Sequence, residues 1–275
     1  MTLLAILLQA AAGAGFAKLG AGIGAGVAAA TDGTGPAGRL GEALSGLVNK
    51  GTITQQQAGF TTQIEEQIHQ VQMKPRTYRL ARRIMKDGVI GRPDCRSVLA
   101  DTGSKAMSKL RQIYSGTVIT EAHGAVIFDR SKANYIRDHF VGRKLAILYC
   151  FNAEGDMLRK VFADTCTDSP ETFNADPQAT YIGQVQASRE GVNLSTADDL
   201  IFIGIDYSAL SYLQGRDRAS YLGRDRANRV HFIFAARGIE PRVYAQVRTK
   251  QNYTTAHYAA DRGILSKEAD QAVRS

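Results

Sequence analysis

The chain has 275 residues, of which 44% are hydrophobic and 22% charged, and this composition excludes a wholly disordered protein. It carries 34 Lys and Arg against 26 Asp and Glu, and the net charge of +8 favours a polyanion or an anionic ligand as partner. The cysteines exclude a disulfide scaffold and a C-x-x-C zinc site, and they favour a reducing compartment; they are Cys95, Cys150 and Cys166.

The first 60 residues differ in composition from the rest of the chain. They hold 13 of the 27 glycines, and Gln9 and Lys18 interrupt their apolar opening stretch. Ala and Gly contribute little to membrane insertion, and no basic residue precedes the stretch as a signal peptide would require. We therefore expect a Gly/Ala-rich extension over 1–60, flexible or helical, without stable membrane association.

A literal G-x-G-x-x-G occurs at Gly33–Gly38. The dinucleotide fingerprint needs a strand before it and a helix that opens on it. No β-branched run precedes this motif, and its surroundings are typical of a turn-rich linker. We reject it as a nucleotide site.

Regular patterning begins after residue 60. Ile64–Lys86 predicts a helix broken near Pro75, with a basic face formed by Arg79, Arg82, Arg83 and Lys86, and Met107–Tyr114 predicts a second helix. Strands are then expected at Ala125–Phe128, Leu145–Phe151, Tyr181–Ala187, Leu200–Ile205 and Val230–Ala235. Helices are expected between them at Lys132–Phe140, Glu154–Ala163, Tyr212–Tyr221 and Pro241–Lys250. Continuous apolar strands that alternate with helices predict a parallel sheet covered on both faces, with a site in the loops at its carboxyl edge.

Two of the connecting segments carry candidate ligand-binding groups. In Ser188–Phe202, Gly191 allows close backbone approach, and Asn193 is one of several short polar side chains that suit a phosphate or sugar. In the next helix Gln214 and Arg218 are four residues apart and share one face. Arginine suits bidentate phosphate contact. The alternative is that the arginine-rich window 216–250 is a solvated surface with local Asp–Arg pairs.

The order of these segments resembles the C-terminal RecA-like lobe of superfamily 2 helicases, especially the SNF2-like helicases of phages. Leu145–Phe151 stands where motif IV is expected. Ser188–Leu194 with Ala197–Phe202 is similar to motif V, and Tyr212–Gln214 with Arg218 is similar to motif VI. The resemblance covers roughly residues 68–262. It implies an α/β fold, in which a RecA-like parallel sheet is covered by helices on both faces.

The resemblance also implies roles for individual residues. Arg218 would be an arginine finger that reaches the γ-phosphate of ATP, with Arg216 as the second candidate for this catalytic role. Tyr221 stands where the family has a further arginine, which Arg216, Arg224 or Arg226 would replace. The implied nucleotide-binding residues are Gln214, Gly191 and Asn193. The implied nucleic-acid-binding residues are Ser188, Arg189, Arg224 and Arg226.

The sequence departs from a complete motor in one respect. It has no G-x-x-x-x-G-K-[ST] P-loop, since Gly103-Ser-Lys105 is preceded by Val98 where the first glycine should stand, and the dipeptide Asp-Glu does not occur. The 60-odd residues before the lobe are too few for a second lobe. We therefore expect no autonomous ATPase, and we expect a separate P-loop lobe to hold most of the ATP and Mg²⁺.

These inferences give a layout and three hypotheses. The expected parts are an extension (1–60), a helical lead-in (61–120), the RecA-like lobe (121–262) and a tail (263–275). The first hypothesis is the second lobe of an ATP-dependent DNA helicase or translocase in the cytoplasm, that of a host cell if the chain is phage-encoded. The alternatives are a non-catalytic nucleic-acid-binding module, and a structural or membrane-associated fusion that acts through residues 1–60.

Overall fold

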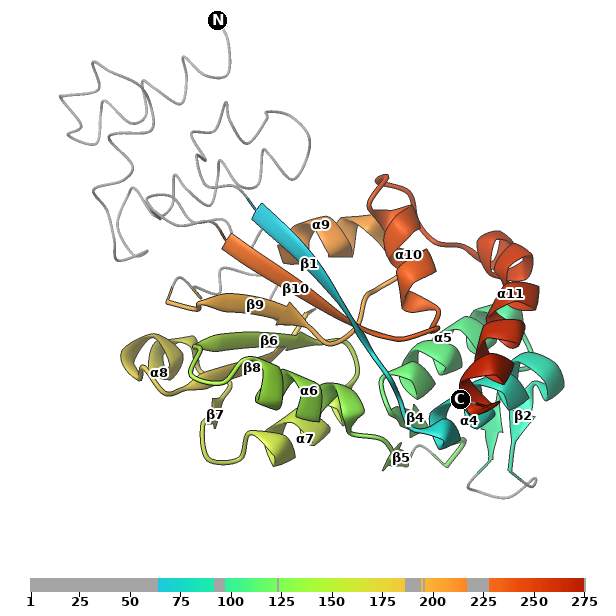
Figure 1. Ribbon diagram of the computed structural model, residues 1–275, viewed down its shortest axis with the longest axis horizontal. Coiled ribbons are helices and arrows are strands. Elements are labelled where there is room, and N and C mark those ends of the chain that lie inside the picture. The colour runs from blue at the N-terminus through green and yellow to red at the C-terminus, as the bar shows by residue number, and fades with distance from the viewer. Residues whose placement is uncertain are drawn as a thin grey trace, which may run out of the picture. The chain divides into compact units, whose positions relative to one another are not determined.

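A six-stranded sheet forms the centre of the protein (Figure 1). The computed structural model describes residues 64–91, 97–122, 124–185, 194, 196–216 and 228–274. Nearly all of them belong to one compact unit, made of Glu66–Arg216 and Arg229–Ser275. In spatial order the sheet contains β1 (Ile64–Val71), β10 (Asn228–Ala235), β9 (Asp199–Phe202), β6 (Leu145–Tyr149), β8 (Thr180–Gln184) and β7 (Cys166–Thr167).

The neighbouring strands β10, β9, β6, β8 and β7 are all parallel. The connections between them carry helices that cover the sheet. From β6 the chain first runs to β7 and β8 on one side of this strand, and later to β9 and β10 on its other side. Because crossovers between parallel strands are right-handed, the connecting helices of these two halves lie on opposite faces of the sheet. The helices in these connections are α7 (Asn152–Val161), α8 (Pro170–Ala175) and α9 (Ala209–Arg216). Two more helices cover the sheet: α6 (Ser131–His139) precedes β6, and α10 (Glu240–Val247) follows β10.

The register of β10 shows that both faces are covered. His231 pairs with Ile201 of β9 and contacts Phe140 at the end of α6. The next residue, Phe232, points to the other face, where its ring packs against Tyr212 of α9 and Tyr244 of α10. The predicted α/β class, a RecA-like parallel sheet with helices on both faces, is therefore confirmed.

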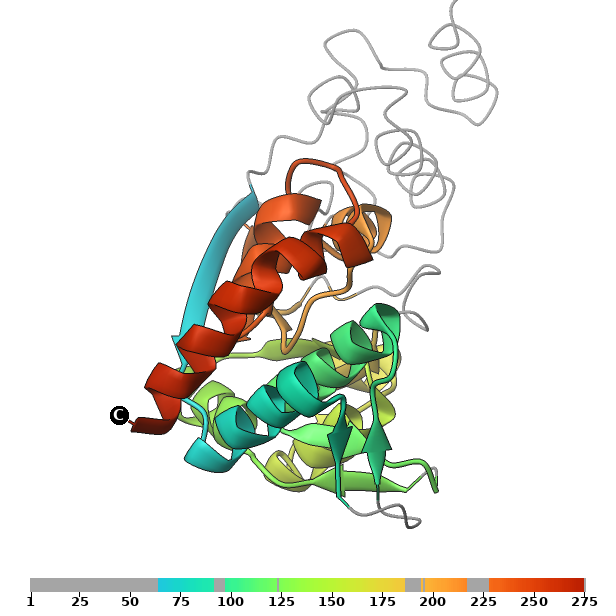
Figure 2. The ribbon, with the colours of Figure 1, turned by 90° about the vertical axis from the view of Figure 1, so that its right-hand side faces the viewer.

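A helical layer lies beside the sheet (Figures 1 and 2). It consists of α4 (Pro75–Asp87), α5 (Gly103–Tyr114) and α11 (Thr255–Arg274), and α4 packs against both of the others. Two small hairpins accompany it, β2 (Val89–Ile90) with β3 (Val98–Leu99) and β4 (Thr117–Ile119) with β5 (Ala125–Ile127). The α11 helix crosses residue 262, where the sequence had suggested the end of the lobe.

Asp129 ties this layer to the covering helices. Its buried carboxylate accepts hydrogen bonds from the backbone N–H of Lys74, at the start of α4, and of Ser131, at the start of α6. Burial would raise the pKa of Asp129, but hydrogen bonds from Ser131, Thr77 and Lys74 hold it below the usual value. The charged carboxylate therefore fixes two helix starts with one side chain.

The predicted helix over Ile64–Lys86 is wrong in its first third. Ile64–Val71 is strand β1, and the helix α4 begins only at Pro75, which occupies its first turn. The segment reads IEEQIHQV, which contains good helix formers, but pairing beside β10 overrides this local preference. Strand β7 and helix α8 were not expected, because two and six residues are too short for a periodic signal.

The other expected elements are present with shifted ends. All five predicted strands and the helices α5, α6, α7 and α10 lie where the apolar patterns placed them. Helix α9 begins three residues before Tyr212, and the predicted continuation to Tyr221 lies outside the described residues. Ala125–Ile127 is a strand as predicted, but it does not belong to the central sheet. It forms a hairpin with β4 instead.

A chain of hydrogen bonds holds β1 to the face that α6 covers. Asp199 Oδ1 lies 2.9 Å from His231 Nε2, His231 Nδ1 lies 2.9 Å from His69 Nε2, and His69 Nδ1 lies 2.9 Å from the Tyr135 hydroxyl. Desolvation, followed by electrostatic interaction with the rings of His231 and His139, lowers the pKa of His69 from 6.5 to about 4, while Asp199 opposes the shift. His69 is therefore neutral in the folded protein at neutral pH.

We expect acid to weaken the fold through His69. Below about pH 6.5 the unfolded chain takes up a proton at this residue that the folded chain takes up only near pH 4, so the free energy of unfolding falls as pH falls through this window. One full proton would change the free energy of unfolding by about 1.4 kcal/mol per pH unit. His69→Gln should reduce the pH dependence of the free energy of unfolding by a fraction of that value, because the ring is partly exposed to solvent. Urea unfolding at a series of pH values measures it.

The matched control for this prediction is His257→Gln, because His257 lies in α11, away from β1. It should keep the wild-type slope between pH 6.5 and 4. Identical slopes in wild type and His69→Gln would contradict the assignment.

Candidate functional site

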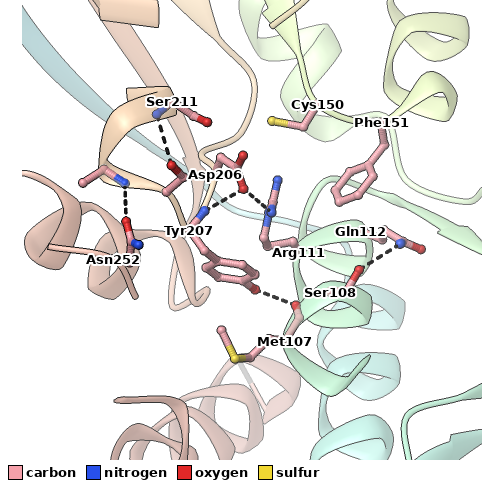
Figure 3. Close-up of polar contacts among 12 residues, drawn as sticks. Met107, Ser108, Arg111, Gln112, Cys150, Phe151, Asp206, Tyr207, Ser211 and Asn252 are labelled. Carbon is pink, nitrogen blue, oxygen red and sulfur yellow. Dashed lines mark hydrogen bonds and ion pairs between the residues drawn. The ribbon is translucent and has the colours of Figure 1, made fainter. Parts of the chain in front are cut away.

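The candidate site is the switch point of the sheet, at the carboxyl ends of β6 and β9. These strands are neighbours, and the chain departs from them in opposite directions across the sheet. In open parallel sheets ligands bind at this switch point, outside the carboxyl ends of the strands. The residues that follow β6 and β9 therefore define the candidate site (Figure 3).

Arg111 reaches the switch point from α5. Its Nη1 donates to Asp206 Oδ1 at 2.9 Å, and the same oxygen accepts from the backbone N–H of Tyr207 at 2.8 Å. The guanidinium carbon lies 5.0 Å from the ring centre of Phe151, which follows β6, and 4.7 Å from that of Tyr207. An ion pair and two cation–π contacts thus hold one cation between the ends of β6 and β9.

Tyr207 extends this contact to the helical layer. Its hydroxyl donates to the backbone carbonyl of Met107 at 2.6 Å, and its ring stacks on Tyr253, just before α11. Burial raises the pKa of Tyr207 well above its usual value, so the hydroxyl remains a donor. We name Arg111, Asp206 and Tyr207 the switch-point latch, since they join α5 to the segment after β9.

The turn from β6 into α7 is fixed by Glu154. Its buried Oε2 accepts from the backbone N–H of Cys150 at 2.8 Å and of Phe151 at 2.9 Å. Desolvation raises the pKa of the Cys150 thiol to about 12, although Arg111 opposes the shift. The thiol therefore stays protonated and is no nucleophile at neutral pH.

A buried ion pair closes the ends of β9 and β10. Lys132 of α6 pairs with Glu240 of α10, and both side chains are almost fully buried. Lys132 Nζ also donates to the carbonyl of Ile203 at 3.1 Å, and Glu240 accepts from the backbone N–H of Ala235 at 2.8 Å. Burial raises the pKa of Glu240, and Lys132 opposes that rise. The pair fixes both strand ends to helices on opposite faces.

Helix α9 is anchored at its start. The backbone N–H of Ala209 donates to Asn252 Oδ1 at 3.0 Å, which satisfies one of the free donors of the first turn. The Tyr212 hydroxyl donates to both carboxylate oxygens of Glu66 in β1, at 2.8 and 2.9 Å, and the Tyr244 hydroxyl of α10 donates to the same carboxylate. The helix that resembles the start of motif VI is therefore held by Asn252 and by the Glu66 carboxylate, which also binds α10.

The structure locates few of the residues that the sequence singled out. Gln214 and Arg216 belong to α9, which follows β9 at the switch point. The other candidates lie outside the described residues, and these are Ser188, Arg189, Gly191, Asn193, Arg218, Arg224 and Arg226. Their predicted roles remain predictions.

Sequence reasoning missed the residues that build the switch point. Arg111 lies in a segment that the sequence marked only as helical, and Asp206 directly follows the predicted strand Leu200–Ile205 without having been singled out. The signal for Lys132 and Glu240 is a charge at the buried start of an amphipathic helix, which is hard to separate from an ordinary surface charge. The described residues contain no group of three side chains suited to a metal ion.

Comparisons with known proteins place the chain beside SNF2-type ATPase structures. It is similar to the C-terminal part of the Fun30 ATPase domain, with 12% identity, TM-score 0.47, and coverage of 76% of this chain and 99% of that one. It is also similar to the Sulfolobus solfataricus SWI2/SNF2 ATPase core domain, with 17% identity and a TM-score of 0.48. That match covers 68% of this chain and 43% of the Sulfolobus chain. The structure of the same core in complex with dsDNA gives 16% identity and a TM-score of 0.45. That match covers 77% of this chain and 48% of the Sulfolobus chain.

The chain spans less than half of the length of the Sulfolobus core in both structures. No protein-family model and no curated protein matches the sequence. Among the described helices, none combines the length and the apolar character that crossing a bilayer requires.

We expect the switch-point latch to be a stability element. Arg111→Met keeps the aliphatic stem but leaves the half-buried Asp206 carboxylate without its cation, and it should cost about 2 kcal/mol of unfolding free energy. Arg137→Met is the control, since among the described residues this exposed arginine pairs only with its neighbour Asp138, and its loss should leave the unfolding free energy nearly unchanged. Chemical denaturation measures both, and equal losses would refute the latch.

Proposed function

We propose that this chain acts as the second lobe of an ATP-dependent superfamily 2 DNA helicase or translocase. In this proposal it contributes an arginine finger and nucleic-acid contacts, and a P-loop lobe outside this sequence holds most of the nucleotide. Arg218 is the proposed finger, with Arg216 as the second candidate. ATP is the substrate, and Mg²⁺ accompanies it on the partner lobe.

One observation carries the proposal. Helix α9, which begins the segment similar to motif VI, starts directly after the carboxyl end of β9 at the switch point of the sheet. It is also fixed there by Asn252 and by the Glu66 carboxylate. A finger has to be aimed from a rigid support, because transition-state stabilisation depends on groups placed before the reaction.

The chemistry then follows from charge. The γ-phosphoryl group carries negative charge on its equatorial oxygens as it is transferred, and a guanidinium brought against them lowers the barrier. The Gln214 amide and the loop with Gly191 and Asn193 are the proposed nucleotide contacts. The proposed contacts to DNA phosphates are Ser188, Arg189, Arg224 and Arg226. Contacts of this kind give a binding affinity that falls steeply with salt and depends little on base sequence.

Cleavage of ATP should require both lobes. The purified chain alone should show no ATPase activity with or without DNA, because the sequence has no P-loop to hold the phosphates. A P-loop lobe of the same system should restore turnover when it is added. Robust turnover by the lone chain would overturn the proposal.

Arginine substitutions in this two-lobe assay identify the finger. Arg218→Ala should lower kcat by about 10³-fold or more, while DNA binding stays nearly intact. Arg216→Ala tests the second candidate, and Arg137→Ala is the control, since that exposed side chain lies on α6. If neither Arg218→Ala nor Arg216→Ala lowers kcat while the chain still binds DNA, the non-catalytic nucleic-acid-binding module is the better account.

A further inference from the structure

Helix α4 presents a row of cations that the proposed motor chemistry does not use. Its exposed basic residues at successive three- and four-residue steps are Arg76, Arg79, Arg83 and Lys86. At 100° per residue these four positions fall within an arc of about 80°, and at 1.5 Å per residue they extend over about 15 Å. We name them the α4 basic face.

The opposite face of α4 is fully used by the core. Its buried residues are Thr77, Tyr78, Ala81, Ile84 and Met85, and this side packs against α5 and α11. The basic face therefore looks outward from the helical layer. No apolar surface of the helix remains for insertion into a bilayer, which an amphipathic membrane helix would need.

Ion pairs do not neutralise the cations of the basic face. Among the described residues no carboxylate lies within salt-bridge distance of Arg79, Arg83 or Lys86. Of the nearby acids, Asp270 pairs with Arg82 at 2.7 Å on the flank that meets α11, and the exposed Asp87 of α4 follows Arg83 by four residues. Like charges at these spacings repel one another and weaken a helix. Lys86 lies in the last turn, where a cation is favourable, but local helix stability gives no reason for the three arginines.

We propose that the α4 basic face binds the phosphate backbone of duplex DNA, as a contact surface separate from the loops of the sheet. A duplex carries one negative charge per about 1.7 Å of its axis, so about 15 Å of helix faces several phosphates. Three of the four cations are arginines, whose planar forks match phosphate oxygens in pairs. This proposal takes from the proposed function only that DNA is the polyanion present.

The test uses the full chain and a labelled DNA duplex over a series of salt concentrations. The variant is the triple substitution R79Q/R83Q/K86Q, and glutamine keeps helix propensity while it removes repulsion between cations. Its affinity at low salt should fall by roughly tenfold or more. The slope of log K against log salt should become shallower by about 2–3, since each lost phosphate contact accounts for about 0.9.

A charge-matched control separates this surface from net charge. R137Q/K160Q/K250Q removes three exposed cations from scattered places on α6, α7 and the end of α10. It should change the slope by less than one. Equal losses in both triple variants, or an unchanged α4 variant, would overturn the proposal. Thermal melts followed by circular dichroism confirm that both variants are folded.

Two further arms identify the partner and the source of any failure. R79K/R83K keeps the charges and should retain most of the salt slope, with weaker binding where a bidentate contact is lost. Vesicles with anionic lipid should not compete with DNA, and competition that the α4 triple variant abolishes would overturn the DNA assignment. If the wild type binds no DNA, this surface and the DNA contacts of the proposed function both fail. If the wild type binds DNA and the α4 triple variant binds it equally well, the proposal for this surface fails and the DNA contacts of the proposed function stand.

Discussion

The buried ion pair between Lys132 and Glu240 is the constraint on which the carboxyl edge of the sheet depends. It ties α6 on one face to α10 on the other, and each partner also holds a backbone group at the end of a strand. Breaking such a pair by removing one partner leaves a buried charge unmatched, typically at a cost of about 3–5 kcal/mol. The ends of β9 and β10 can therefore shift only together with both helices, and α9 starts from this rigid edge.

Charge is used in two different ways in this molecule. Within the carboxyl edge the cations Lys132 and Arg111 are matched by carboxylates and hydrogen bonds, so they position the backbone and have little capacity left for a ligand. On the outer face of α4 the cations Arg79 and Arg83 have solvent on their outward side. An excess of positive charge attracts a polyanion only through groups of the second kind, since paired charges cancel at a distance.

The fold was largely predictable because buried parallel strands have a simple signature. Runs such as Leu145–Phe151 and Leu200–Ile205 are apolar at every position, which only a strand covered on both faces requires. The switch-point latch was not predictable, because it is built by residues far apart in the sequence. Arg111 and Asp206 are 95 positions apart, and no spacing rule connects a helix residue to a strand end that lies across the fold.

Strand β1 shows why one segment was misread and what it does instead. Edge strands carry polar residues on both sides, so Ile64–Val71 lacks the apolar run of the inner strands and its Glu and Gln residues favour a helix. Glu66 and His69 are three positions apart and so lie on opposite faces of the strand. Glu66 holds α9 and α10 on one face, and His69 connects to Tyr135 of α6 on the other. The polar pattern that conceals the strand in the sequence thus lets one edge strand fasten both helical layers to the sheet.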